Sequence, residues 1–394
     1  MSVLTLTPAQ ERQHLQLLGL AGFASMASMR ICDPMLVVLS EEFQVSTGDA
    51  SAVVSVYAVV YGLSQLFFGP LGDRFGKLRV VSLAILACAV FSAITALSVS
   101  LPMLVIMRGF MGAAAAGVIP LSMAWVGDRV PYERRQETLA KLMSATVIGM
   151  MSGLWFGGLT ADTLGWRGAF VVLAILFAMA AGLLLKLLRG QAMPVSADAP
   201  GLWASFRNTG QLLATPRVRW VLGVTATEGA LVFGTMAFMP THLHQHYDLS
   251  VVAAGSVMML YGVGGLLYSQ MARRWLAWLG ERGLVKTGAA LVATGMLLLA
   301  WGTLPWMGML ACGMAGLGFY MLHNTLQVQA TQMAPAARGT AVTLFASSLF
   351  FGQSTGVLLM AQSVDMGWLA YAFSAAAAGV VVLGGVVFRL VGRH

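Results

Sequence analysis

The sequence has little charge: only 10% of its 394 residues are Asp, Glu, Lys or Arg, whereas a typical soluble domain has about 25%. It also has only three cysteines, Cys32, Cys88 and Cys312, and each lies in an apolar stretch. The low charge and a mean hydropathy of +0.80 exclude an ordinary soluble enzyme and a disordered chain. The scattered cysteines exclude a disulfide scaffold and a zinc site of the usual spacing.

Patterns for catalysis and for ATP binding are also missing. No phosphate-binding loop of the G-x-x-x-x-G-K-[ST] type occurs, which argues against transport driven by ATP. No nucleophile–base pair is visible, so we expect neither an enzyme nor a bound cofactor. The net charge of +8 does not indicate a nucleic-acid partner, because the basic residues do not gather in one patch.

Long apolar stretches predict an all-α integral membrane protein with twelve transmembrane helices, since about 20 apolar residues cross a bilayer. The predicted spans are Leu17–Leu39, Ala50–Gly69, Val80–Val99, Leu101–Val126, Leu139–Leu159, Ala169–Leu188, Val218–Thr241, Val251–Ala272, Val285–Leu304, Trp306–Ala330, Thr340–Gln362 and Trp368–Leu390.

The positive charges predict how these spans are oriented. With both termini inside, twenty Lys and Arg residues fall on the inner side and one, Arg167, falls outside. Inner loops of membrane proteins carry such an excess. We therefore predict cytoplasmic termini and a multi-pass protein of the cell inner membrane, with the lipid bilayer as a partner and no nucleic acid.

The chain divides into two similar halves. Pro131-x-x-Arg134 follows the fourth span and Pro335-x-x-Arg338 follows the tenth, and Gly112 matches Gly316 in the same register. Such a repeat predicts two pseudo-symmetric six-helix bundles with a substrate cavity between them, near the midplane. The predicted units are an N-terminal bundle over 1–189, a cytoplasmic linker over 190–216 and a C-terminal bundle over 217–394.

The loop between the second and third spans reads GPLGDRFGKLR from Gly69 to Arg79. Its glycines allow a tight turn, and Asp73 can accept charge-assisted bonds that form when the halves close on one side. This loop resembles the signature loop of the major facilitator superfamily, and the resemblance extends over the whole chain. We expect a gating role for Gly69, Asp73, Arg74, Gly76, Lys77 and Arg79.

The fifth span carries a second glycine pattern. Gly149-x-x-x-Gly153-Leu154-x-x-Gly157-Gly158 resembles the motif of the drug:proton antiporter branch, although that branch has Gly-Pro where this chain has Gly153-Leu154. The resemblance implies hinge roles for the four glycines. It also implies a major facilitator fold, a monomer, and proton-coupled efflux of small organic or drug-like molecules.

Four charged residues lie deep inside predicted spans: Arg30, Asp33, Arg108 and Glu228. Each costs on the order of 3 kcal/mol or more near mid-bilayer, so each needs an explanation. At about 1.5 Å per residue, Arg30 and Arg108 reach the same depth, and Asp33 shares a helix face with Arg30. This predicts one cluster of two cations and an anion. Glu228 has no obvious basic partner in a neighbouring span, so we expect it to be neutral.

The charges allow several functions. Asp33 is a proton-coupling candidate, because protonation would release an arginine; alternatively Arg30 and Arg108 hold an organic anion, or the ion pair only locks two spans together. Glu228 carries a proton, contacts a cationic substrate, or is a neutral acid bonded to a neighbouring helix.

Weaker signals come from polar and aromatic residues in other spans, which suit either a cavity lining or ordinary helix packing. These cavity candidates are Tyr57, Tyr61, Gln65, Trp155, His323, Asn324, Gln327 and Gln353. Past the seventh span, His242, His244 and His246 are a weak metal candidate, and a solvated loop is the alternative.

The sequence thus predicts a secondary transporter whose partners are protons and a small-molecule substrate. Its most favoured activity is proton-coupled efflux. The alternatives are uptake or exchange of an organic anion, and a non-transporting membrane receptor or scaffold on the same fold.

Overall fold

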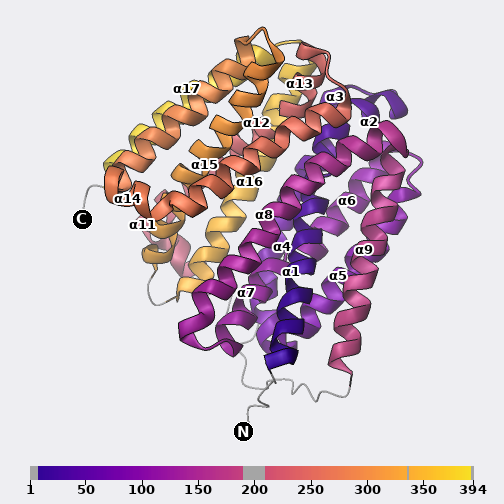
Figure 1. Cartoon of the computed structure of the whole chain (residues 1–394), viewed down its shortest axis with the longest axis vertical. Coiled ribbons are helices and arrows are strands. Elements are labelled where there is room, and N and C mark those ends of the chain that lie inside the picture. The colour runs from indigo at the N-terminus through magenta and orange to yellow at the C-terminus, as the bar shows by residue number, and fades with distance from the viewer. Residues whose placement is uncertain (1–7, 190–208, 335–336, 392–394) are drawn as a thin grey trace.

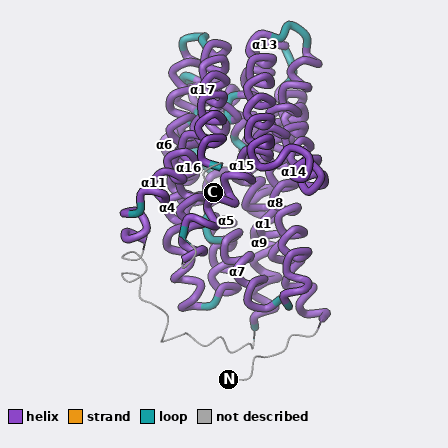
Figure 2. The backbone as a smooth tube through the Cα atoms, turned by 90° about the vertical axis from the view of Figure 1, so that its left-hand side faces the viewer, coloured by secondary structure: helices purple, strands orange, loops and turns teal. Residues whose placement is uncertain are grey.

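A computed structural model describes residues 8–189, 209–334 and 337–391, and these residues form helices joined by short turns, with no β-strand among them. The helices from α1 to α9 lie together on one side of the molecule and those from α11 to α17 on the other (Figure 1). The helices run roughly along the long axis (Figure 2). Most of the predicted linker, 190–208, lies outside the described residues, so the domain boundaries stay a prediction.

The N-terminal helices are α1 (Pro8–Arg30), α2 (Leu36–Phe43), α3 (Thr47–Ala50), α4 (Ala52–Phe75), α5 (Lys77–Ala96), α6 (Leu101–Ala115), α7 (Val118–Arg129), α8 (Tyr132–Thr163) and α9 (Gly165–Leu188). The C-terminal helices are α11 (Pro216–Glu228), α12 (Gly234–Met236), α13 (Met239–Tyr247), α14 (Val251–Trp301), α15 (Pro305–Met333), α16 (Arg338–Asp365) and α17 (Leu369–Leu390).

Within the described residues, eleven helical stretches are long and apolar enough to cross a membrane. The longest, α14, has 51 residues, which corresponds to about 77 Å at 1.5 Å per residue and exceeds a bilayer core of about 30 Å. Its backbone turns at Gly280, which has φ 66° and ψ 173°. Glycine adopts this conformation without a side-chain clash. The helix therefore holds the predicted eighth and ninth spans, and the twelve-span fold class is confirmed.

The first predicted span, Leu17–Leu39, is not one continuous helix. Its α-helix α1 ends at Arg30, a 3-10 turn η1 covers Asp33–Met35, and α2 completes the crossing. Pro34 explains the break, because proline has no backbone N–H and clashes with the preceding helical turn. Arg30 and Asp33 therefore sit at a helix end, where backbone carbonyls lack their usual partners.

The seventh predicted span, Val218–Thr241, is interrupted at the matching place. Here α11 ends at Glu228 and a π-helical turn η2 covers Gly229–Phe233 before α12 and α13 begin. A π-helical turn inside an α-helix occurs often at functional sites. The first and seventh spans are thus both interrupted, and each break adjoins a buried charged residue.

The predicted hinge glycines pack helices closely against each other. A Cβ atom at Gly153 in α8 would lie 2.8 Å from Ala27 Cα in α1, and one at Gly356 in α16 would lie 2.7 Å from Ala230 Cα in η2. Gly149 and Gly157 also meet α1 and its break, whereas Gly158 meets Val251 and Val252 of the other half. The same helix contact thus recurs in both halves.

The halves are bonded to each other at one end of the molecule. Asp365 at the end of α16 accepts hydrogen bonds from the Gly48 N–H and the Ser46 hydroxyl, both at 2.8 Å. Asp162 near the end of α8 accepts one from the Val252 N–H at 2.9 Å. Both carboxylates meet the N-terminal end of a helix, where the helix dipole favours negative charge. The charge distribution predicts that this is the outer end.

Candidate functional site

Arg30 and Asp33 form an ion pair at the break after α1. Arg30 Nη1 lies 3.2 Å from Asp33 Oδ2, and both side chains are fully buried. The Arg30 guanidinium also lies 4.6 Å from the centre of the Phe233 ring, which belongs to the other half. Arg30 Nε and Nη2 and Asp33 Oδ1 have no hydrogen-bond partner among the described residues. The arginine therefore sits where the two halves meet, with donors to spare.

Arg108 lies beside this pair but is bonded differently. Its guanidinium donates to the backbone carbonyls of Ser28 at 2.8 Å, Met29 at 3.4 Å and Val53 at 3.2 Å. Its charge also lies 4.1 Å from the centre of the Tyr57 ring. Two of the three carbonyls belong to the last turn of α1, which has no intrahelical donors to use. Arg108 is thus directed at the backbone of α1 and α4, whereas one alternative from the sequence had it hold an organic anion.

Glu228 has a partner that we did not anticipate. Its Oε2 lies 2.9 Å from His323 Nδ1 of α15, and the carboxyl is fully buried. The expectation that no basic residue reaches Glu228 was wrong, because His323 is 95 residues further along the chain. His323 itself was a cavity candidate. The signal that would have paired them is the similar depth of two polar residues in neighbouring spans.

Aromatic rings connect the two charged centres. The Phe319 ring stacks on His323 at 4.9 Å between centres, and it lies 4.9 Å from the Phe233 ring. Phe233 in turn lies under the Arg30 guanidinium. A continuous series of contacts therefore runs from Arg30 in one half to Glu228 in the other.

The other cavity candidates separate into two groups. Tyr57, Tyr61, Gln65 and Gln353 are buried, whereas Trp155 and Gln327 are exposed. Asn324 is partly buried and donates to the Tyr320 carbonyl at 2.8 Å. Tyr61 packs edge-on against Phe350 of the other half, with ring centres 4.7 Å apart. The four buried candidates therefore lie at contacts between helices. Trp155 and Gln327 are exposed and do not join them.

The predicted loop GPLGDRFGKLR is mostly helical, because Gly69–Phe75 end α4 and Lys77–Arg79 begin α5, and only Gly76, at φ 90°, lies between the two helices. Lys77 Nζ lies 3.3 Å from Asp73 and 2.5 Å from Asp128 at the end of α7. Arg74 lies over the neighbouring Phe75 ring. The loop's described ion pairs thus stay within the N-terminal half, in contrast to the bonds that join the halves at the opposite end.

The three clustered histidines lie on α13 and do not form an extended loop. His242 and His246 stack with ring centres 4.9 Å apart. Each lies 2.9 Å from a backbone carbonyl, of Leu299 and Gly302 respectively, and His244 lies 2.5 Å from the Leu249 carbonyl. In the part of the chain that the structure describes, no group of three or more His, Cys, Asp and Glu residues is placed to hold a metal ion.

Asp162 and Asp365 escaped the sequence analysis because acids at the ends of spans look like ordinary solvated residues. Both are followed within three residues by a glycine with positive φ, Gly165 and Gly367. That shared position in the two halves was the available signal.

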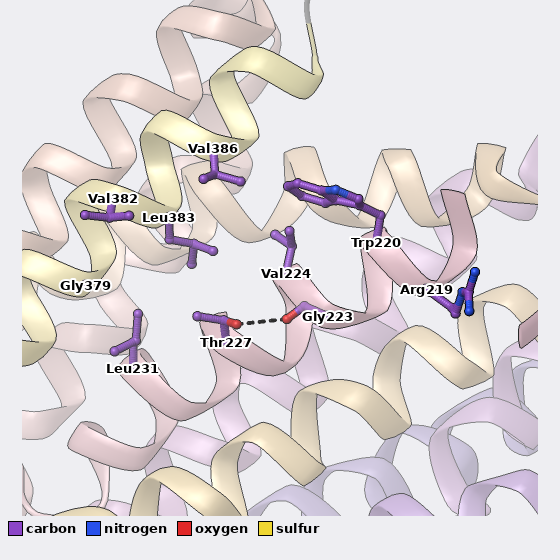
Figure 3. Close-up of a pocket in the computed structure, with 10 residues that line it drawn as sticks. All are labelled: Arg219, Trp220, Gly223, Val224, Thr227, Leu231, Gly379, Val382, Leu383 and Val386. Atoms are coloured by element: carbon purple, nitrogen blue, oxygen red, sulfur yellow. Dashed lines mark hydrogen bonds between the residues drawn. The ribbon is translucent and has the colours of Figure 1, made fainter. Parts of the chain in front are cut away.

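Two grooves lie away from the buried charged residues Arg30, Asp33 and Glu228. One, of about 830 Å³, lies between α1 and α8 and is edged by charged residues that include Glu11, Arg134 and Lys141. The other, of about 620 Å³, lies between α11 and α17 (Figure 3). Its lining residues are Arg219, Trp220, Gly223, Val224, Thr227, Leu231, Gly379, Val382, Leu383 and Val386.

Two bundles of membrane-spanning helices that meet at buried polar residues are the architecture of many secondary transporters. Residues 18–357 match the Major Facilitator Superfamily, and the chain belongs to that family. It is 26% identical over 338 residues to the uncharacterized MFS-type transporter YceJ of Bacillus subtilis, covering 83% of each chain. It is 29% identical over 178 residues to the inner membrane transport protein YnfM of Escherichia coli, which spans 45% of this chain and 42% of that protein.

The crystal structure of the nucleoside transporter NupG is similar in fold. Its TM-score is 0.75 at 17% sequence identity, and the match covers 98% of this chain and 100% of NupG. At this identity the likeness concerns the fold alone.

Proposed function

We propose that this protein is a proton-coupled secondary transporter that exports small organic molecules across the cell inner membrane. The observation that carries the proposal is the contact between the fully buried Glu228 and the partly buried His323, with 2.9 Å between the carboxyl oxygen and the ring nitrogen. The family consists of transporters, so we set aside a receptor or scaffold role. The excess of inner Lys and Arg supports cytoplasmic termini, and the name of YnfM is consistent with the inner membrane.

The Glu228–His323 pair is suited to carry a proton. A carboxyl group and an imidazole can each bind or release a proton, and these two side chains meet at the contact between α11 and α15. A charged carboxylate in a dry site is stable only while a cationic or donating partner stays close. Loss or gain of a proton therefore changes how strongly α11 holds α15. That change links proton movement to a rearrangement of the helices.

Asp33 is the second proton-coupling candidate. A proton on Asp33 removes its charge and frees Arg30, which already touches the other half through Phe233. Protonation there would therefore alter a contact between the halves. Asp33 lies at the break of the first span and Glu228 at the break of the seventh, so the two acids occupy corresponding positions.

Alternating access would use the bonds at the two ends of the molecule. We propose that residues 1–189 and 217–394 rock against each other as two units, as one monomer, with the glycine contacts of α8 and α16 as close-packed pivots. Asp162 and Asp365 bond the two halves to each other at the predicted outer end, and in this proposal these bonds keep that end closed. The Gly69–Arg79 loop would make the equivalent bonds when the inner end closes.

Exchange of an organic anion is the second candidate, and one observation favours it. Arg30 keeps two buried guanidinium nitrogens, Nε and Nη2, without a partner among the described residues, and its guanidinium lies over the Phe233 ring. Arginine binds carboxylates through such paired donors. Arg108 does not contribute, because its donors are taken by backbone carbonyls.

The test uses everted membrane vesicles with an acidic lumen and a pH-sensitive dye. Lipophilic cations, antibiotics, organic anions and sugars are added one at a time. We expect a compound that releases protons through the wild-type protein and fails to do so with Glu228→Gln. The matched control is Glu137→Gln, because Glu137 is an exposed glutamate of α8 paired with Lys141.

Two results would contradict the proposal. One is the absence of proton release with every compound, and the other is unchanged coupling in both Glu228→Gln and Asp33→Asn. An exchange assay with radiolabelled carboxylates, comparing wild type with Arg30→Gln, would then test the second candidate.

A further inference from the structure

The groove between α11 and α17 lies on the outer surface of the C-terminal helices. Its lining residues Trp220 and Val382 are 44% and 67% exposed. In a membrane protein, such an exposed apolar surface faces lipid. Gly223 and Gly379 line the groove without side chains, and a Cβ atom at Gly223 would meet nothing within 4 Å (Figure 3).

The groove is apolar along its length and charged at one end. Valine and leucine side chains form the walls, and the hydroxyl of Thr227 already donates to the Gly223 carbonyl at 2.9 Å. Arg219 stands at one end and Leu231 at the other (Figure 3). Arg219 is exposed and makes no ion pair with another described residue.

The dimensions match one leaflet of a bilayer. From Arg219 to the end of α11 at Glu228, nine residues of helix span about 14 Å, and half of a bilayer core is about 15 Å. The charge distribution places Arg219 at the inner surface, three residues after α11 begins. Trp220 beside it is of the type found at the membrane–water interface.

We infer that this groove binds an anionic phospholipid of the inner leaflet, with one acyl chain between α11 and α17 and the phosphate on Arg219. The apolar walls suit a hydrocarbon chain, and the arginine suits a phosphate diester. Arg217 and Arg389, near the same ends of α11 and α17, add positive potential there. The lipid would bridge the helix that ends at Glu228 and the last helix of the chain.

The experiment compares lipids bound to the full-length protein. Protein purified in dodecyl maltoside is incubated with equal amounts of phosphatidylglycerol and phosphatidylcholine of the same acyl chains, and retained lipid is counted by native mass spectrometry. One arginine near the surface contributes about 1 kcal/mol, so we expect a preference for phosphatidylglycerol of about fivefold in the wild type. Arg219→Gln should abolish the preference.

A second pair of variants tests the groove itself. Gly223→Leu should fill it and prevent retention of the lipid, while Gly385→Leu on α17 should have no effect. A Cβ atom at either glycine meets nothing within 4 Å, so both variants should fold, and Gly385 does not line the groove. Equal melting temperatures of the two variants in lipid-free detergent would verify this.

Three outcomes would overturn the inference. They are equal retention of both lipids by the wild type, a preference that survives Arg219→Gln, and a preference that survives Gly223→Leu. The assay does not involve protons, so its result is separate from that of the proposed proton coupling.

Discussion

The two halves break their first helix at corresponding places but use the breaks differently. In the N-terminal half, Arg108 donates to three backbone carbonyls from α1 and α4. In the C-terminal half, Glu228 and His323 bond to each other through side chains alone. A cation bonded to backbone fixes helix positions, whereas two titratable side chains can change charge while the helices stay intact. Arg108 is thus suited to architecture, and the Glu228–His323 pair to proton transfer.

The largest effect on stability is expected at Arg108. Arg108→Leu leaves three buried carbonyls without their donor, each of which costs about 1–3 kcal/mol. We expect the free energy of unfolding to fall by about 3–5 kcal/mol, measured by thermal unfolding in mild detergent. Arg108→Lys keeps the positive charge and some hydrogen-bond donors, so its free energy of unfolding should fall by less than that of Arg108→Leu. An Arg108→Leu protein as stable as the wild type would refute the architectural role.

The next largest effect is expected at the glycine contacts. Gly153→Val and Gly356→Val each place side-chain atoms against a neighbouring helix backbone, and overpacking of this kind costs about 1–3 kcal/mol. We expect similar losses of stability in the two halves. Gly182→Val on α9 is the control, because a Cβ atom there meets nothing within 4 Å. A loss in only one half would show that the matching contacts are not equivalent.

A smaller effect is expected at the bonds that join the halves. Asp365 accepts two hydrogen bonds across the interface and Asp162 accepts one, and a bond to a charged group contributes about 1.5–3 kcal/mol. Asp365→Asn should therefore open the predicted outer end more often than Asp162→Asn does.

Glu41 and Asp248 are exposed residues near the predicted outer end, one in each half. Spin labels at these two positions would report the distance between the halves by pulsed electron paramagnetic resonance. An unchanged distance distribution in a variant that carries both Asp162→Asn and Asp365→Asn would show that these bonds do not hold the predicted outer end closed.

The smallest change in stability is expected at Glu228. Glu228→Gln keeps the shape and one bond to His323 but cannot exchange a proton, so we expect less than about 1 kcal/mol of lost stability and no proton coupling. Thermal unfolding and the vesicle assay measure the two properties on the same preparation. A destabilisation as large as that of Arg108→Leu would show that both centres are architectural.

The sequence predicted much of this arrangement from particular residues. Apolar length predicted the spans, and the depths of Arg30 and Arg108 predicted that they lie together. It did not predict that Arg108 bonds to backbone, because that depends on carbonyls freed by the break after α1. Nor did it pair Glu228 with His323, since spacing along two distant spans specifies depth but not the rotation of each helix.

The sequence by itself determined that this chain is a twelve-span membrane protein with an internal repeat, because hydropathy and the positions of charge act locally along the chain. Only the tertiary structure decided which charges have partners and at which end of the molecule hydrogen bonds of Asp162 and Asp365 join the two halves. Those properties depend on how helices pack and rotate against each other, and contacts such as Asp365 with Gly48 join residues more than 300 positions apart.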